Sequence, residues 1–186
     1  PFKIRARDIS EATITPPEDV VYNGSYQEPP ATVTYNGTTL ERGTDYYAHY
    51  YDNEDVGTAR VELVGNEYHG WTGTAEYYFE IEPMNLSDTG ITWYELGAQM
   101  YTGSEIEPYV AWTTAGVTSE GIGLYKGSDF DVTYTNNVYP GVATATLTGR
   151  ANYTGTHETT FDIIGWIYDA DGLGEFNGAE LPWNGE

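Results

Sequence analysis

The sequence contains no cysteine among its 186 residues, and this absence excludes several kinds of site at once. Without a thiol the chain can form no disulfide, offer no thiolate to a metal ion and use no cysteine nucleophile. Small secreted domains of eukaryotes often carry disulfides. We therefore expect either a cytosolic protein or a bacterial surface protein.

Basic residues are scarce as well. The chain has seven lysines and arginines against 29 aspartates and glutamates, which gives a formal net charge of −22. Such a charge repels nucleic acid and anionic membranes, so we expect neither as a partner. No run of 18 apolar residues is present, and we expect no membrane insertion.

Helical periodicity and the common catalytic motifs are also missing. No window of ten or more residues places apolar side chains at helical spacing. The sequence has no G-x-S-x-G, no phosphate-binding loop and no H-E-x-x-H. Carboxylates occur throughout, so a pair of them carries no information about glycosidase chemistry. We expect a non-enzymatic protein without a cofactor.

What the sequence does contain is a long internal repeat. The stretch from Gly43 to Gly65 returns as Gly127 to Gly149, an offset of 127 − 43 = 84 residues. Self-similarity at this spacing indicates that one structural unit is built twice. Each copy predicts a strand, a turn and a second strand. Between earlier apolar runs, Asn36-Gly37 predicts a two-residue hairpin turn.

The two copies also separate the residues of each strand by face, because successive side chains of a strand point to opposite sides. Alternate positions that are apolar in both copies predict the inner face. The positions between them are polar in the second copy and predict the outer face. The inner set is Tyr46, Ala48, Tyr50, Ala59, Val61 and Leu63, matched by Phe130, Val132, Tyr134, Ala143, Ala145 and Leu147.

Strand patterns separated by Gly and Asn turns predict an all-β chain of two tandem, small antiparallel β-sandwich domains of Ig-like type. Repeat 1 spans 8–84 and repeat 2 spans 85–165. Residues 1–7 match the closing strand of a preceding repeat, and 166–186 match the start of a third repeat or form a tail. A β-grasp-like fold is the alternative, although it needs a helix for which the sequence offers no candidate.

Several short motifs recur in order through both copies. In repeat 2 they read Tyr-Thr-Gly at 101–103, Gly-Ser-Asp-Phe at 127–130, Asn-Asn at 136–137 and Asn-Tyr-Thr-Gly at 152–155. This succession resembles a tandem repeat of large cell-wall and surface proteins of Gram-positive gut bacteria. The resemblance covers nearly the whole chain and implies an extracellular location at the cell surface or cell wall. It also implies a role as spacer in a stalk, adhesin or filament, with no active site to carry over.

A ligand-binding module is the alternative function. Tyr47, His49 and Tyr51 share the outer face of one strand, and Tyr78 joins them if its strand lies beside theirs. Flat aromatic side chains stack on sugars and anchor protein contacts, so a host glycan or protein is the expected ligand. The competing interpretation is a contact between repeats, or tyrosines and a histidine that are merely exposed.

The two ends of the chain suggest assembly. Phe2-Lys3-Ile4 matches Phe79-Glu80-Ile81, and Phe176 to Leu181 matches the opening of repeat 2. One explanation is a segment cut from a longer array of neighbouring repeats. The other is head-to-tail assembly of copies, in which a terminal strand adds to the next chain's sheet with Phe2 and Ile4 as inward anchors.

One acidic stretch mimics a calcium loop. Asp169, Asp171, Glu175 and Glu180 stand within a twelve-residue window that places Asp at positions 1 and 3 and Glu at position 12. Leu173 at position 5 breaks the template, and no amphipathic helix flanks the window. The third repeat explains Phe176 to Leu181 better, so we expect no metal site.

Overall fold

The computed structural model describes residues 6–88, 90–110, 112–114, 123–169 and 172–176. The fold is all-β, with 51% strand and 4% helix. Within the described ranges the helical part consists of two short 3-10 turns, η1 (Ile9–Glu11) and η2 (Glu67–His69). The predicted all-β, sandwich-like class is thus confirmed. The chain divides into two compact units, unit 1 (Pro1–Met84) and unit 2 (Asn85–Glu186).

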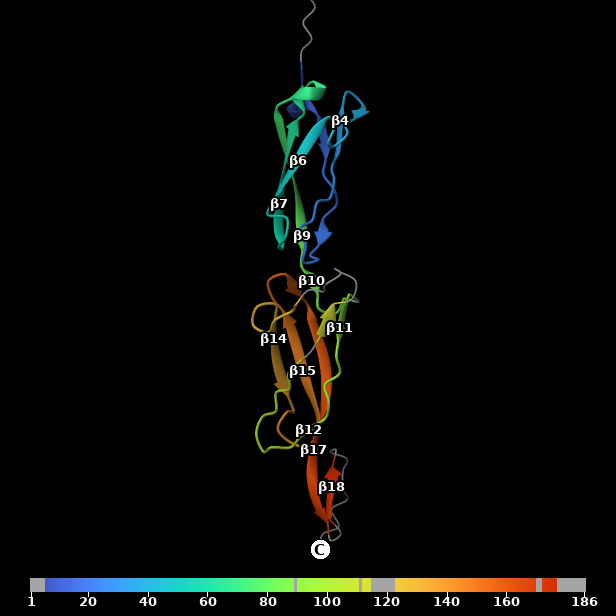
Figure 1. Cartoon of the computed structure of the whole chain (residues 1–186). Coiled ribbons are helices and arrows are strands. Elements are labelled where there is room, and N and C mark those ends of the chain that lie inside the picture. Colours follow the sequence, from blue (N-terminus) through green and yellow to red (C-terminus); the bar gives the residue numbers. More distant parts are fainter. Residues whose placement is uncertain (1–5, 89, 111, 115–122, 170–171, 177–186) are drawn as a thin grey trace, which may run out of the picture. The chain divides into compact units, whose positions relative to one another are not determined.

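Unit 1 contains a four-stranded main sheet, in which β6, β7 and β9 lie side by side (Figure 1). A three-stranded sheet and a two-stranded pair complete the unit. The main sheet has the order β3 (Val20–Val21), β9 (Thr74–Glu82), β7 (Gly57–Gly65), β6 (Tyr46–Tyr51). The smaller sheets are β2 (Thr13–Thr15), β4 (Thr32–Tyr35), β5 (Thr38–Thr39), and β1 (Arg7–Asp8) with β8 (Trp71–Thr72).

Unit 2 repeats this plan. Its main sheet has the order β12 (Gln99–Met100), β17 (Thr156–Asp169), β15 (Gly141–Gly149), β14 (Phe130–Thr135). The paired strands are β10 (Met84–Asn85) with β16 (Tyr153–Thr154), and β11 (Ile91–Trp93) with β13 (Trp112–Thr114). The end of β17 also pairs with β18 (Gly172–Phe176). The predicted start of a third repeat reaches beyond β18 into 177–186, outside the described residues, and stays a prediction.

The predicted antiparallel pairing is accompanied by a few short parallel pairs, so the two main sheets are mixed. β3 runs parallel to β9, β12 parallel to β17, and β1 parallel to β8. The parallel partners β3, β12, β1 and β8 are all two residues long and come from segments distant in sequence. No hairpin turn joins them, so nothing imposes the antiparallel direction that a tight connection would require.

The predicted hairpin of each copy is confirmed. β6 pairs antiparallel with β7 from Tyr46↔Gly65 to Tyr51↔Arg60, and β14 pairs with β15 in the same register. Alternate side chains are buried as the repeat predicts: Ala59, Val61 and Leu63 are at most 1% exposed. Burying a side chain such as Val61 or Leu63 contributes about 1.5–3 kcal/mol, so this inner face carries much of the stability of unit 1.

The Asn36-Gly37 turn also forms as predicted. Both residues have positive φ, 47° and 78°, and they join β4 to β5 with Tyr35 paired to Thr38. A two-residue turn of this kind requires left-handed backbone at both positions, which asparagine and glycine tolerate best. Val33 on β4 is 1% exposed, so this hairpin belongs to the core of unit 1.

A buried asparagine fastens each main hairpin to a crossing segment. Asn53 follows β6 in a five-residue loop, and its side-chain Nδ2 donates to the carbonyl of Gln27 at 2.9 Å. Gln27 N–H returns a bond to the carbonyl of Asn53 at 2.8 Å. In unit 2, Asn137 makes the same two bonds with Ile106, at 3.2 and 2.8 Å. These reciprocal bonds hold the segment that leaves the main sheet against the hairpin loop.

A second shared device lies where the chain begins each unit. Asp8 Oδ1 accepts from Ser10 N–H at 2.9 Å, and Asn85 Oδ1 accepts from Ser87 N–H at 3.0 Å. The hydrogen bond from Ser10 lowers the pKa of Asp8 below its ordinary value. A glycine with φ of 77° or 74° faces each of these side chains, and a Cβ there would collide with it. A residue with a side chain at position 73 or 155 would therefore clash with Asp8 or Asn85, and glycine is required at both positions.

Candidate functional site

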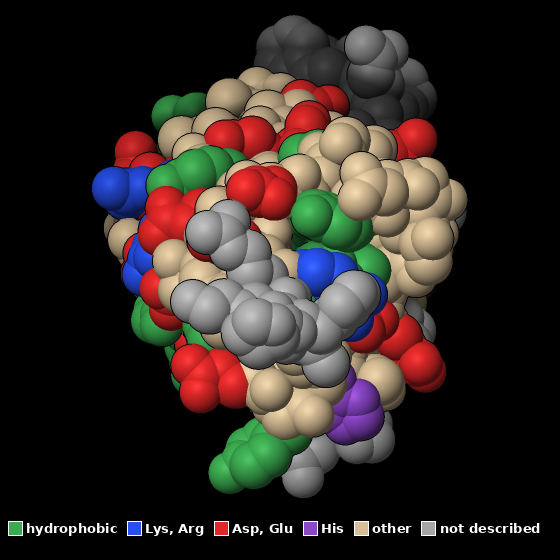
Figure 2. Space-filling model, turned by 90° about the horizontal axis from the view of Figure 1, so that it is seen from above, with side chains coloured by type: hydrophobic (Ala, Val, Ile, Leu, Met, Phe, Trp, Pro, Cys, Tyr) green, Lys and Arg blue, Asp and Glu red, His purple; other side chains and the backbone are tan. Residues whose placement is uncertain are grey.

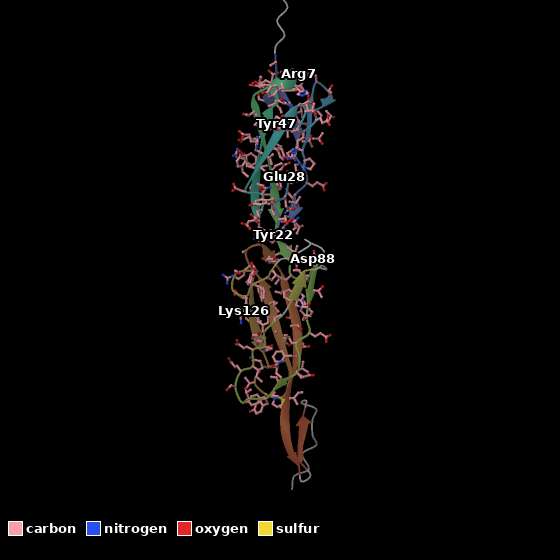
Figure 3. All side chains as sticks on the ribbon, viewed as in Figure 1. Arg7, Tyr22, Glu28, Tyr47, Asp88 and Lys126 are labelled. Carbon is pink, nitrogen blue, oxygen red and sulfur yellow. The ribbon has the colours of Figure 1, made fainter. Side chains whose placement is uncertain are left out.

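The outer face of β6 carries the side chains that the sequence analysis singled out. Tyr47 and Tyr51 are 47% and 39% exposed, and His49 between them is exposed too. Alternation along β6 places all three on one side of the main sheet, opposite Tyr46, whose side chain is buried. Tyr47 is labelled in Figure 3. This face is the aromatic face of unit 1.

Tyr78 lies on the same face but not beside β6. β7 stands between β6 and β9, and the register aligns Tyr51 with Arg60 and Arg60 with Tyr78. The two tyrosines therefore flank an arginine in a row that crosses three strands. We call Tyr51, Arg60 and Tyr78 the aromatic row. Alternation along the sequence placed Arg60 on the outer face. It did not show that Arg60 lies between the two tyrosines, because the neighbours of a residue on adjacent strands depend on how the strands pair.

Arg60 organises the aromatic row. Its guanidinium carbon lies 4.1 Å from the centre of the Tyr51 ring, within the range of a cation–π contact. Arg60 Nη1 also forms an ion pair with Glu76 Oε1 at 2.7 Å, and Tyr78 O–H donates to the other carboxylate oxygen at 3.0 Å. Tyr51 O–H donates to Glu62 Oε2 at 3.4 Å. The row is thus a set of exposed rings whose orientation is fixed by charged neighbours.

The hydrogen bonds of Glu76 shift the pKa of two groups in this row. They raise the pKa of Arg60 above its ordinary value and raise the pKa of Tyr78 as well. Both shifts favour the charge states that already prevail at neutral pH. The row therefore presents a fixed arginine–glutamate pair and a neutral phenol, and neither group is poised to exchange protons.

Tyr47 has a second role, within the fold. Its hydroxyl accepts from Asn66 Nδ2 at 3.3 Å, and the same nitrogen donates to the carbonyl of Thr44 at 2.8 Å. Asn66 is 4% exposed and caps η2 through a bond from Tyr68 N–H. Tyr47 is thus tied to the loop that contains η2, whereas Tyr51 and Tyr78 bond only to glutamates on their own face among the described contacts.

Unit 2 presents a different surface at the matching positions. Thr135, Thr144 and Thr160 align across β14, β15 and β17 where unit 1 has Tyr51, Arg60 and Tyr78. Further exposed threonines on this face are Thr133, Thr148 and Thr156, and the exposed side chains of Asp131, Val142, Glu158 and Asp162 lie among them. The aromatic row is therefore a property of unit 1 alone.

A concavity that the sequence analysis missed lies along the edge of β6. A hollow of about 440 Å³ is lined there by Tyr26, Glu28, Tyr50 and Tyr51 among others. Tyr26 is 71% exposed and follows the Asn23-Gly24 turn, where no alternation assigns it to a face. Glu28, labelled in Figure 3, pairs with Arg42 Nη2 at 2.8 Å. No sequence pattern indicates that the segment with Tyr26 and Glu28 lies beside β6.

The remaining predicted site residues lie beyond what the structure describes. Phe2 and Ile4 fall in 1–5, and Asp171 and Glu180 fall in 170–171 and 177–186, all outside the described residues. Asp169 and Glu175 lie in β17 and β18, but their side chains are not among those described. The assembly strand therefore stays a prediction, and so does the expected absence of calcium from the acidic window.

The described part of the chain has neither a metal-binding cluster nor a membrane-spanning helix. No group of three or more His, Cys, Asp or Glu side chains there could hold a metal ion. No helix among the described residues has the length and apolar character to cross a bilayer. Acidic side chains are spread over the face seen in Figure 2, in keeping with the net charge of −22.

Comparison with known proteins gives no assignment: no family model matches the chain, and no curated protein matches it. The arrangement of the described residues is therefore the basis for a functional proposal. The two units share one strand arrangement, and unit 1 has an aromatic outer face where unit 2 has a threonine-rich one.

Proposed function

We propose that this chain is a non-enzymatic structural segment of a bacterial cell-surface protein, serving as spacer in a stalk, adhesin or filament. One observation carries the proposal: both units keep the same interior bonds while their exposed faces differ. The reciprocal bonds of Asn53 and Asn137 recur in the same geometry. A spacer needs each unit to fold reliably in series and places few demands on surface side chains.

The contrast with a binding or catalytic array supports this choice. Copies that share a binding role would present the same exposed groups in each unit. Here the row formed by Tyr51, Arg60 and Tyr78 is replaced by three threonines in unit 2. The acidic exterior also suits a surface protein, because a high net charge keeps neighbouring copies apart.

Location and mechanics test the proposal. Antibodies against the chain should label intact cells in immunogold electron microscopy, and labelling only after lysis would contradict a surface role. Single-molecule stretching should give two unfolding events, each releasing roughly 80 residues or about 270 Å of chain. One event releasing the full length at once would contradict a series of independent spacers.

A second function rests on the aromatic row. Tyr51 and Tyr78 are 39% and 51% exposed and are held on either side of Arg60, which suits stacking on a sugar or a protein side chain. A glycan array with the intact chain and with the Y51T/Y78T variant tests this. The variant carries unit 2 residues at both positions and leaves Tyr47 in place. Binding that survives both substitutions would exclude the row as the ligand site.

Head-to-tail assembly is the third element of the proposal. Copies would join when the segment that carries Phe2 and Ile4 adds to a sheet of the next chain. Light scattering on the intact chain should show a mass that grows with concentration. Removal of residues 1–5, which keeps Arg7 and its pairing with Trp71, should leave a monomer. An intact chain that stays monomeric at high concentration would rule this out.

A further inference from the structure

One edge of the main sheet in unit 1 has no partner strand in the described part of the chain. β6 is the last strand in the order β3-β9-β7-β6. The carbonyl of Asp45 accepts from Asn66 N–H at 2.9 Å on the β7 side, and the carbonyl of Tyr46 accepts from Gly43 N–H at 2.7 Å on the other side. Since these directions alternate, Ala48 and Tyr50 point their backbone groups away from β7.

These outward groups form a short open edge. Within the described chain, the backbone N–H and C=O groups of Ala48 and Tyr50, which point away from β7, have no backbone hydrogen-bond partner. An open edge offers N–H and C=O groups on which another extended chain can pair. The Gly43 bond covers the edge at Tyr46, so the open part is the section from Ala48 to Tyr51.

A groove accompanies this edge. The hollow beside β6 shares Tyr26 and Asn53 with a second hollow of about 450 Å³, which is lined by the loop that follows β6. The two hollows together are the edge groove. Tyr26, which is mostly exposed, stands where they meet. The groove therefore continues from the open backbone edge to the loop.

The two ends of the edge groove differ in charge. At one end Arg42 neutralises Glu28 and lies over the Tyr50 ring, 5.1 Å from its centre. At the other end the loop carries three exposed carboxylates and no basic residue. These are Asp52, Glu54 and Asp55. A ligand on this surface meets backbone hydrogen-bonding groups, an exposed ring and negative charge.

Unit 2 offers the same edge without this lining. Gly127 N–H donates to Phe130 C=O at 2.7 Å, so Val132 and Tyr134 point their backbone groups outward as Ala48 and Tyr50 do. The corresponding loop reads Asn-Asn-Val-Tyr-Pro from 136 to 140 and has no carboxylate. Glu105 stands at the position of Tyr26. Unit 2 is therefore an internal control.

We propose that unit 1 binds an extended, lysine- or arginine-bearing segment of another protein by adding it as a strand to β6. Backbone bonds to Ala48 and Tyr50 give the segment its direction. Its cationic side chains reach the carboxylates of the 52–55 loop and the ring of Tyr26. This role goes beyond that of a spacer and differs from stacking on the aromatic row, with which the edge groove shares Tyr51.

The probe is a synthetic ten-residue peptide in which lysine and valine alternate, titrated into the intact chain and followed by amide NMR. We expect the amides of Ala48 and Tyr50 to shift and to gain protection from hydrogen exchange. The amides of Val132 and Tyr134 should stay unchanged. Added salt should weaken the binding, because exposed charge pairs are screened. A peptide alternating glutamate and valine should not bind.

Two control experiments separate strand addition from simple charge attraction. The same lysine–valine peptide, N-methylated at every residue, keeps its charges but cannot form the backbone ladder on either edge and should not bind. The D52N/E54V/D55Y variant replaces the three carboxylates of the loop by the side chains that unit 2 has at these positions. It should bind about tenfold more weakly, because three exposed charge pairs are lost.

The loop variant is expected to fold, because Asp52 and Asn136 have the same backbone, with φ of 54° and 56°, and both loops keep the buried asparagine. An unchanged thermal unfolding midpoint checks this. Equal binding of the N-methylated peptide, equal shifts at Val132 and Tyr134, or no binding at all would each overturn the proposal. Self-association of the free chain through Ala48 and Tyr50 would assign the edge to a second copy and overturn it too.

Discussion

Units 1 and 2 share their interior and differ on their surface. Asn53 and Asn137 make the same reciprocal bonds, and Gly73 and Gly155 face Asp8 and Asn85 at matching positions. On the outer face of the main sheet, Tyr51, Arg60 and Tyr78 of unit 1 are replaced by threonines in unit 2. Interior positions are constrained by partners on several sides, whereas an exposed strand position needs only to tolerate extended backbone. Any binding role specific to one unit therefore depends on the surface residues that differ between the units.

The largest expected effect comes from removing a shared anchor. Asn53→Ala deletes the donor to the Gln27 carbonyl and leaves that carbonyl without its side-chain partner. We expect unit 1 to lose about 2–3 kcal/mol of unfolding free energy, measured by urea denaturation. Asn137→Ala should do the same to unit 2.

The matched control for this pair is Asp52→Asn, which introduces the residue of unit 2 at an exposed position and should change stability by less than about 0.5 kcal/mol. Amide hydrogen exchange then tells which unit is affected. If Asn53→Ala opens unit 2 as much as unit 1, the two units do not fold separately and the comparison between them fails.

An intermediate effect is expected from pH, through His157 of unit 2. His157 stacks on Trp93 with ring centres 4.7 Å apart, whereas unit 1 has Ala75 at this position. Burial lowers the pKa of His157 below 6.5. The unfolded chain then binds more protons than the folded one below pH 6.5, so the stability of unit 2 falls as pH drops from 7 toward 5.

His157→Phe keeps a ring against Trp93 and removes the titrating group. Thermal unfolding at pH 7 and pH 5 should show a smaller loss for this variant than for the original chain, since the carboxylates titrate alike in both. Equal losses would mean that His157 contributes nothing to the pH response and that the two units differ less than their cores indicate.

The smallest effect on stability belongs to the aromatic row. Arg60→Thr introduces the unit 2 residue and removes an exposed ion pair, so we expect almost no change in the free energy of unfolding. The rings of Tyr51 and Tyr78 should then become more mobile, which ring-proton NMR detects. A loss of several kcal/mol would show that this face is structural, against the view that it is free to vary.

Much of the hairpin architecture could be predicted from the sequence, because it depends on local spacing. Alternation along 46–51 and 57–65 assigned Tyr46 and Val61 to the inner face and Tyr47 and Tyr51 to the outer face, and the burial of these side chains agrees. Asn36-Gly37 predicted its turn because few other residue pairs accept positive φ twice in succession.

What the tertiary structure decided is which strands and segments meet. β7 separates β6 from β9, so Arg60 stands between the two tyrosines, and Asn53 bonds to a residue 26 positions away in the sequence. The open edge of β6 and the groove beside Tyr26 depend on the same strand order. Periodicity specifies the face of a strand, but the neighbour of a strand depends on how distant segments pack together, and no local pattern contains that information.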